Sequence, residues 1–107
     1  MIMIELTLPL LEHRRLFANM KMYYRDVVIE ISRSKSIGVT RIFLEDTPKG
    51  WWLATRLLRK YPGKLYKLQE TKYIDIPSKI MELSRKRWNP KMNEEIERAL
   101  KEWGVMR

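Results

Sequence analysis

The chain has 107 residues, of which 45% are hydrophobic and 33% charged, a composition that is typical of a globular protein and argues against disorder. The absence of cysteine excludes disulfides and thiolate metal sites, and His13 is the only histidine, so we expect neither a metal nor a cofactor. The formal net charge of +9 favours a polyanionic partner.

No apolar run approaches the roughly 18 residues that a membrane span needs. The opening MIMIELTLPLL lacks the basic start and the small-residue cleavage site of a signal peptide. We therefore expect a cytoplasmic protein with no membrane partner. Three Asn and one Gln against eleven Lys and eleven Arg make a thermophile-like composition.

The positive charge is concentrated in the middle of the chain. Residues 1–46 hold seven cations and six anions, for a net charge of +1. Residues 47–91 hold twelve cations and three anions (+9), and residues 92–107 three cations and four anions (−1). A concentrated basic region predicts binding to nucleic acid through counterion release. A generally basic solvated surface and attraction to an anionic membrane are the alternatives.

The first two elements expected are a strand and a helix. Residues 2–8 are aliphatic and alternate with Glu5 and Thr7, which predicts a short strand that Pro9 ends. A helical period then predicts a helix over residues 9–25, with His13 at the edge of the core. Its apolar side would carry Leu10, His13, Phe17, Met20 and Tyr24, and its opposite side Arg14, Arg15 and Lys21.

Residues 26–46 allow two interpretations. DVVIEIS and VTRIFLE are rich in β-branched residues and alternate, and the polar SRSKSIG between them can turn a hairpin. The apolar residues at the start of this segment also continue the preceding helix. We favour two strands, because successive β-branched residues lose side-chain freedom in a helix.

Residues 47–63, TPKGWWLATRLLRKYPG, predict one helix with both ends marked. Thr47 is a good N-cap and Pro48 suits the first helical position. Pro62 cannot continue a helix, and Gly63 can adopt the left-handed conformation that ends one. The apolar stripe expected to face the core consists of Trp51, Ala54, Leu57, Leu58 and Tyr61.

A second face of this helix carries the candidate binding residues. Lys49, Trp52, Arg56 and Arg59 are spaced three, four and three apart, so that three cations surround one indole. We expect Trp52 to be exposed and available for base stacking, with a cation–π contact from Arg56 as the alternative. The full predicted nucleic-acid-binding set is Lys49, Trp52, Arg56, Arg59, Lys64 and Lys67.

The remainder of the chain predicts strands and then two helices. KLYKLQ and YIDI are strand candidates, and Pro77 starts a helix that runs to about Arg87. Asn89 and Pro90 can begin the last helix, with Gly104 just past its end. The single domain, residues 1–107, would then comprise an α+β core (1–76) and a C-terminal helical pair (77–107).

The resulting order is βαββαβ, the split βαβ or ferredoxin-like arrangement of an α+β fold, with two C-terminal helices appended. If residues 26–46 were helical, the chain would instead be a winged helix–turn–helix. Residues 48–61 would then form its recognition helix and residues 64–76 its wing.

The expected function is non-catalytic nucleic-acid binding, with DNA favoured over RNA. One alternative is an assembly module that forms a homodimer through the last helix, whose stripe a small core would leave partly uncovered. The other is a metal-dependent nuclease, because Asp26, Glu30 and the nearby Lys35 faintly match a carboxylate–lysine pattern. The homodimer stripe consists of Met92, Ile96, Leu100 and Trp103.

Overall fold

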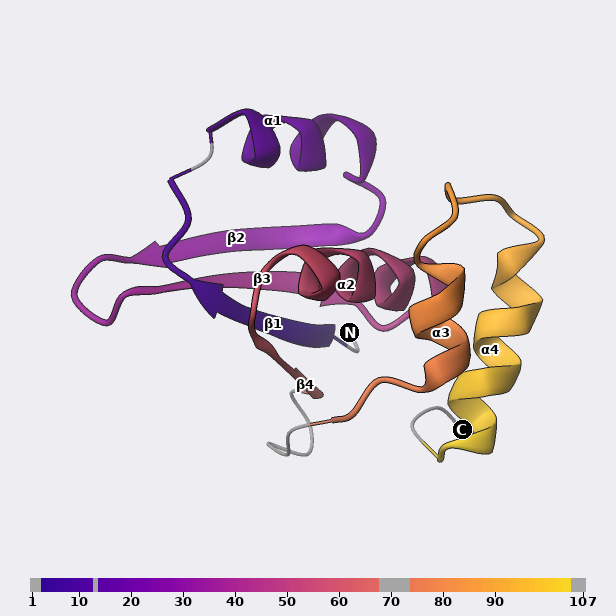
Figure 1. Cartoon of the computed structure of the whole chain (residues 1–107). Helices are drawn as coiled ribbons and strands as arrows, with labels where there is room; N and C mark the ends of the chain where they lie inside the picture. Colours follow the sequence, from indigo (N-terminus) through magenta and orange to yellow (C-terminus); the bar gives the residue numbers. More distant parts are fainter. Residues whose placement is uncertain (1–2, 13, 68–73, 105–107) are drawn as a thin grey trace.

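A computed structural model describes residues 3–12, 14–67 and 74–104. Within these ranges the chain has an α+β structure with a four-stranded antiparallel sheet and four helices (Figure 1). Three predicted features lie outside the described residues: the position of His13, the end of the strand predicted from Lys64, and Tyr73 at the start of YIDI. Residues 74–76, the rest of YIDI, are described and do not form the predicted strand. In chain order the elements are β1 (Met3–Pro9), α1 (Arg14–Tyr23), β2 (Val28–Ser34), β3 (Val39–Glu45), α2 (Pro48–Lys60), β4 (Lys64–Lys67), α3 (Ser78–Leu83) and α4 (Met92–Glu102).

The sheet has the strand order β2-β3-β1-β4, and each neighbouring pair is antiparallel. Residues 26–46 form the β2–β3 hairpin, whose turn ends at Gly38 with a φ of 75°. The helical interpretation of this segment is therefore wrong, and so is the winged helix–turn–helix that depended on it. The physical reason is cross-strand pairing, since Ile31 of β2 pairs with the buried Ile42 of β3. A register shift between Val28 and Glu30 interrupts the alternation of β2 and leaves Ile29 exposed.

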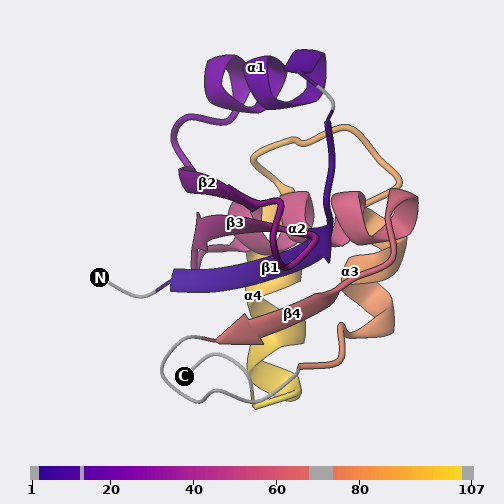
Figure 2. The ribbon, with the colours of Figure 1, turned by 90° about the vertical axis from the view of Figure 1, so that its left-hand side faces the viewer.

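One face of the sheet forms the core. Alternate residues of β1 and β3 are fully buried, and the Trp51 side of α2 is buried with them. Both views show α1 beyond the edge strand β2, with α2 across the sheet and α3 and α4 beside α2 (Figures 1 and 2). On the opposite face, Glu5 pairs with both Phe43 and Tyr66. The buried strand residues are Ile4, Leu6, Leu8, Thr40, Ile42, Leu44 and Leu65.

Helix α2 begins as predicted and ends differently. Thr47 caps it, because the Thr47 hydroxyl accepts the Gly50 N–H at 3.2 Å, and Pro48 is its first residue. At the C-terminal end Tyr61 leaves the helix in an extended conformation, and Gly63 does not have the positive φ that we expected. Gly63 instead lies against the Thr7 carbonyl oxygen and the Leu8 side chain, where a Cβ has no room.

The C-terminal helices pack on α2. Helix α3 is shorter than predicted, so that Arg85, Lys86 and Arg87 follow it rather than lie on it. Helix α4 buries Met92, Ile96, Ala99 and Leu100, and Gly104, beyond its end as predicted, has a positive φ of 71°. Three of the four residues expected to form a homodimer interface are thus covered within the chain, and only Trp103 stays exposed. The homodimer remains an untested prediction.

Candidate nucleic-acid interface

Lys49, at the start of α2, makes an ion pair and cation–π contacts within the protein. Its Nζ donates to Asp26 Oδ2 at 2.8 Å, so that the turn before β2 is linked to the helix. The same ammonium lies 5.9 Å from the ring centre of Tyr24 and 5.8 Å from that of Trp88. Only 22% of the Lys49 side chain is exposed. The geometry gives Lys49 a structural contact with a carboxylate and two aromatic rings.

Trp52 is buried, and the expectation that it is exposed is wrong. Its exposed fraction is 1%, and its indole N–H donates to the Lys86 carbonyl oxygen at 3.1 Å. The ring centres of Tyr24 and Trp88 lie 5.8 and 5.6 Å away, and the Arg56 guanidinium covers the ring at 5.2 Å. The cation–π alternative therefore describes this residue, and the indole has no face open to a base.

Arg56 and Arg59 each combine a structural contact with an exposed side chain. Arg56 Nη1 donates to the carbonyl oxygens of Ser84 and Lys86, both at 3.2 Å, and Arg59 Nη1 donates to that of Ser84 at 3.3 Å. These carbonyls lie at and just beyond the end of α3, where cations are favourable. Because a guanidinium has five N–H donors, each arginine keeps donors for another partner.

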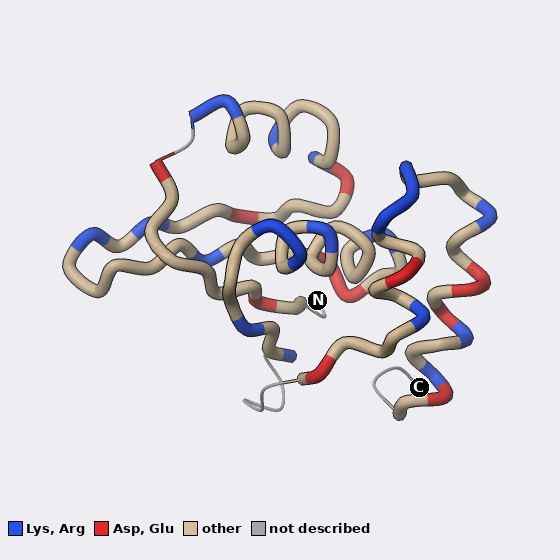
Figure 3. The backbone as a smooth tube through the Cα atoms, in the orientation of Figure 1, with Lys and Arg blue, Asp and Glu red and all other residues tan. Residues whose placement is uncertain are grey.

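A groove between α1 and α2, here called the basic groove, has a volume of about 640 Å³. Arg56, Arg59, Lys60 and Arg85 supply its positive charge, and none of the described residues that line it is acidic. Figure 3 shows Lys and Arg on both helices, with Asp or Glu on the connection that follows α1 and on β2. The remaining lining residues are Leu16, Asn19, Met20, Tyr23, Tyr24, Leu53 and Leu57.

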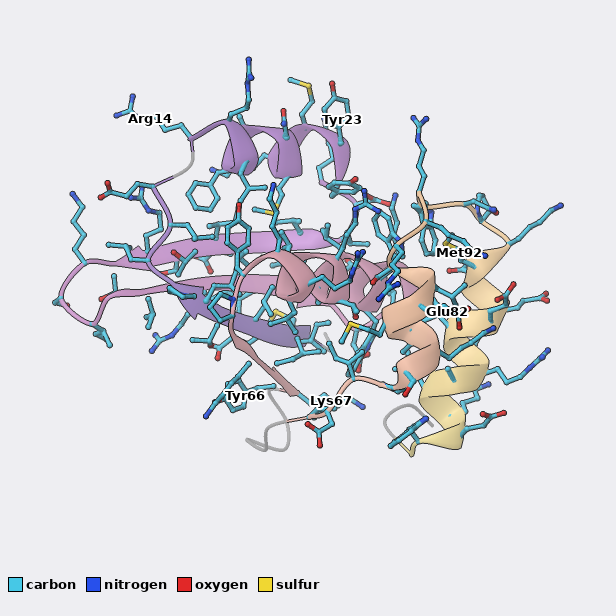
Figure 4. The ribbon with its side chains drawn as sticks, viewed as in Figure 1. Arg14, Tyr23, Tyr66, Lys67, Glu82 and Met92 are labelled. Atoms are coloured by element: carbon cyan, nitrogen blue, oxygen red, sulfur yellow. The ribbon has the colours of Figure 1, made fainter. Side chains whose placement is uncertain are left out.

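Lys64 and Lys67 lie on β4, at the opposite edge of the sheet from β2. Lys67 pairs with Asp46 at 3.4 Å, and 4% of the Asp46 side chain is exposed. Asp46 Oδ1 also accepts the Trp51 indole N–H at 2.6 Å, so that this carboxylate joins β4 to α2. In Figure 4, Lys67 is far from Tyr23 of α1. The structure therefore does not bring Lys64 and Lys67 together with the basic groove.

The predicted binding set included only Arg56 and Arg59 of the groove lining, and the residues it missed include Asn19, Tyr23, Lys60 and Arg85. Lys60 follows Arg59 directly in the chain, which was the one usable signal. The four cations of residues 14–25 do not line the groove. Nothing in the sequence indicates that Arg85 lines the same groove as Arg59 and Lys60 at the end of α2.

The carboxylates considered for a nuclease are not assembled into a metal site in the described part of the chain. Asp26 is paired with Lys49, and Glu30 is exposed on β2. Within residues 3–12, 14–67 and 74–104 there is no group of three or more His, Asp or Glu side chains that could hold a metal ion. Nuclease activity remains untested.

Comparison of the chain with protein-family models, with curated proteins and with solved structures gave no match. In the described ranges, every helix is too short or too polar to cross a membrane.

Proposed function

We propose that this protein binds nucleic acid without cleaving it, and that the basic groove is the contact surface. The observation that carries the proposal is the groove lining, in which four cations from α2 and the turn after α3 occur without an acid among the described lining residues. A cationic concavity attracts a polyanion, because each phosphate contact releases condensed counterions.

The proposed surface differs from the one expected from sequence. Arg56 and Arg59 remain in it, and Lys60 and Arg85 join them. Trp52 is left out because it is buried, and Lys49 because its ammonium is already paired with Asp26. Lys64 and Lys67 are left out because β4 lies at the far edge of the sheet.

We also propose that the fold is the split βαβ, or ferredoxin-like, arrangement with two added helices. The element order βαββαβ and the strand order β2-β3-β1-β4 support it, because β1 and β2 then run parallel with β3 between them. A fold of this kind hosts many functions, so the functional proposal depends on the groove alone.

Titration of labelled DNA and labelled RNA with the protein, at several salt concentrations, tests this function. Four phosphate contacts predict that log K falls with log salt with a slope of about −3 to −4. Absence of binding to both nucleic acids at low salt would refute the proposal. The same samples incubated with Mg²⁺ or Mn²⁺ should contain intact nucleic acid, and metal-dependent cleavage lost in Glu30→Ala would establish the nuclease instead.

A further inference from the structure

The two walls of the basic groove differ in chemistry. Every cation of the lining comes from α2 or from Arg85, on one side. The α1 side, with Tyr24 just after the helix, contributes two apolar residues, an amide and two tyrosines, and no charge. Leu53 and Leu57 of α2 add apolar surface between them. A ligand that fills this groove therefore meets positive charge along one flank and apolar and aromatic surface along the other.

We propose that the basic groove takes single-stranded nucleic acid, with a base stacked on Tyr23. This inference rests on the function proposed above and specifies the class of nucleic acid. A single strand has its phosphates on one side and its unpaired bases on the other, which matches the two walls. Binding in a positively charged groove together with stacking on aromatic side chains is the general mode by which proteins hold single strands.

The same geometry disfavours a duplex. Proteins that bind duplex DNA usually insert a projecting helix or ribbon into the major groove, which is about 12 Å wide. Helix α2 cannot project in this way, because the sheet, α3 and α4 pack around it and most of its residues are buried. A duplex laid over a concave groove would also bring phosphates against the uncharged α1 wall, where no cation of the lining can compensate them.

Tyr23 is placed to receive a base at the rim of the groove. It is the last residue of α1, and 65% of its surface is exposed. Figure 4 shows its side chain projecting outward from the end of the helix. An exposed ring next to a cationic groove is available to an unpaired base, whereas a paired base keeps its faces stacked within the duplex.

The test compares one labelled oligonucleotide as a single strand and as a duplex with its complement, at equal salt. We expect the single strand to bind more tightly. Tyr23→Ala should weaken single-strand binding by at least about fivefold, leave the salt slope unchanged and leave duplex binding unchanged. Tyr23→Phe should retain the affinity, because stacking needs the ring and not the hydroxyl.

Met22→Ala is the matched control, since Met22 is the preceding residue, is equally exposed at 65% and does not line the basic groove. The Met22→Ala variant should bind the single strand with the affinity of the wild type. Duplex binding as tight as single-strand binding, or Tyr23→Ala behaving like Met22→Ala, would overturn this inference while the proposed function stands. No binding to either form would instead refute the proposed function itself.

Discussion

The two ends of α2 carry the same kind of side chain and use it differently. At the first turn, the Lys49 ammonium is paired with Asp26 and lies near Tyr24 and Trp88. At the last turn, Arg59 and Lys60 are exposed and line the basic groove. Arg56 lies between the two ends of α2, where its guanidinium covers Trp52 and also lines the basic groove. One helical face is thus structural at its start and, in our proposal, functional at its end.

This difference shows what helical spacing can and cannot predict. Spacing places cations on one side of a helix, but the elements that arrive from elsewhere determine which of them remain available. Asp26 and Trp88 are far from Lys49 in the chain and still occupy its ammonium. Substitutions near the start of α2 should therefore change the stability of the protein, and substitutions near its end should change nucleic-acid binding.

The largest expected effect is at Trp52. Trp52→Ala should lower the free energy of unfolding by about 3–5 kcal/mol, because it removes a fully buried indole and leaves a cavity between Tyr24 and Trp88. Chemical denaturation measures this change. An unchanged stability together with a specific loss of nucleic-acid binding would restore the stacking role first expected for this residue.

Gly50, also in the first turn, should not accept a side chain. A Cβ at this position would collide with the Glu45 carbonyl oxygen, and a backbone atom cannot easily move away. Overpacking of this kind costs about 1–3 kcal/mol and exceeds the gain of up to about 1 kcal/mol in helix propensity. Gly50→Ala should therefore lower the melting temperature, and a higher one would show that this turn is loosely packed.

Much of the fold could be predicted from sequence, because the signals were local. Alternation identified β1 and the β2–β3 hairpin, and the Thr47–Pro48 cap fixed the start of α2. Trp52 could not be placed, since its burial depends on Tyr24, Trp88 and the Lys86 carbonyl, which only tertiary packing brings together. The basic groove could not be predicted for the same reason, as it exists only where α1 meets α2.

Substitution of Lys49 should lower the stability by a smaller amount, and it tests whether this charge is structural or contacts nucleic acid. Lys49→Met should destabilise the protein by roughly 1 kcal/mol, a modest value because its partner Asp26 is about half exposed. A double-mutant cycle with Asp26→Asn should give a coupling energy of about 0.5–1 kcal/mol. Binding of nucleic acid by the folded variant should keep the wild-type salt slope. A reduced slope would make Lys49 part of the contact surface.

The central claim is that the cations of the basic groove bind phosphate, and the most direct test is the salt slope of a matched pair of variants. Lys60→Gln with Arg85→Gln removes two groove cations, and Lys35→Gln with Arg41→Gln removes one lysine and one arginine from the β2–β3 hairpin. Both double variants change the net charge by the same amount. The account predicts that the first reduces the magnitude of the slope by about two contacts and that the second leaves it near the wild-type value. Equal slopes for the two variants would contradict it, because binding would then depend on net charge and not on the groove.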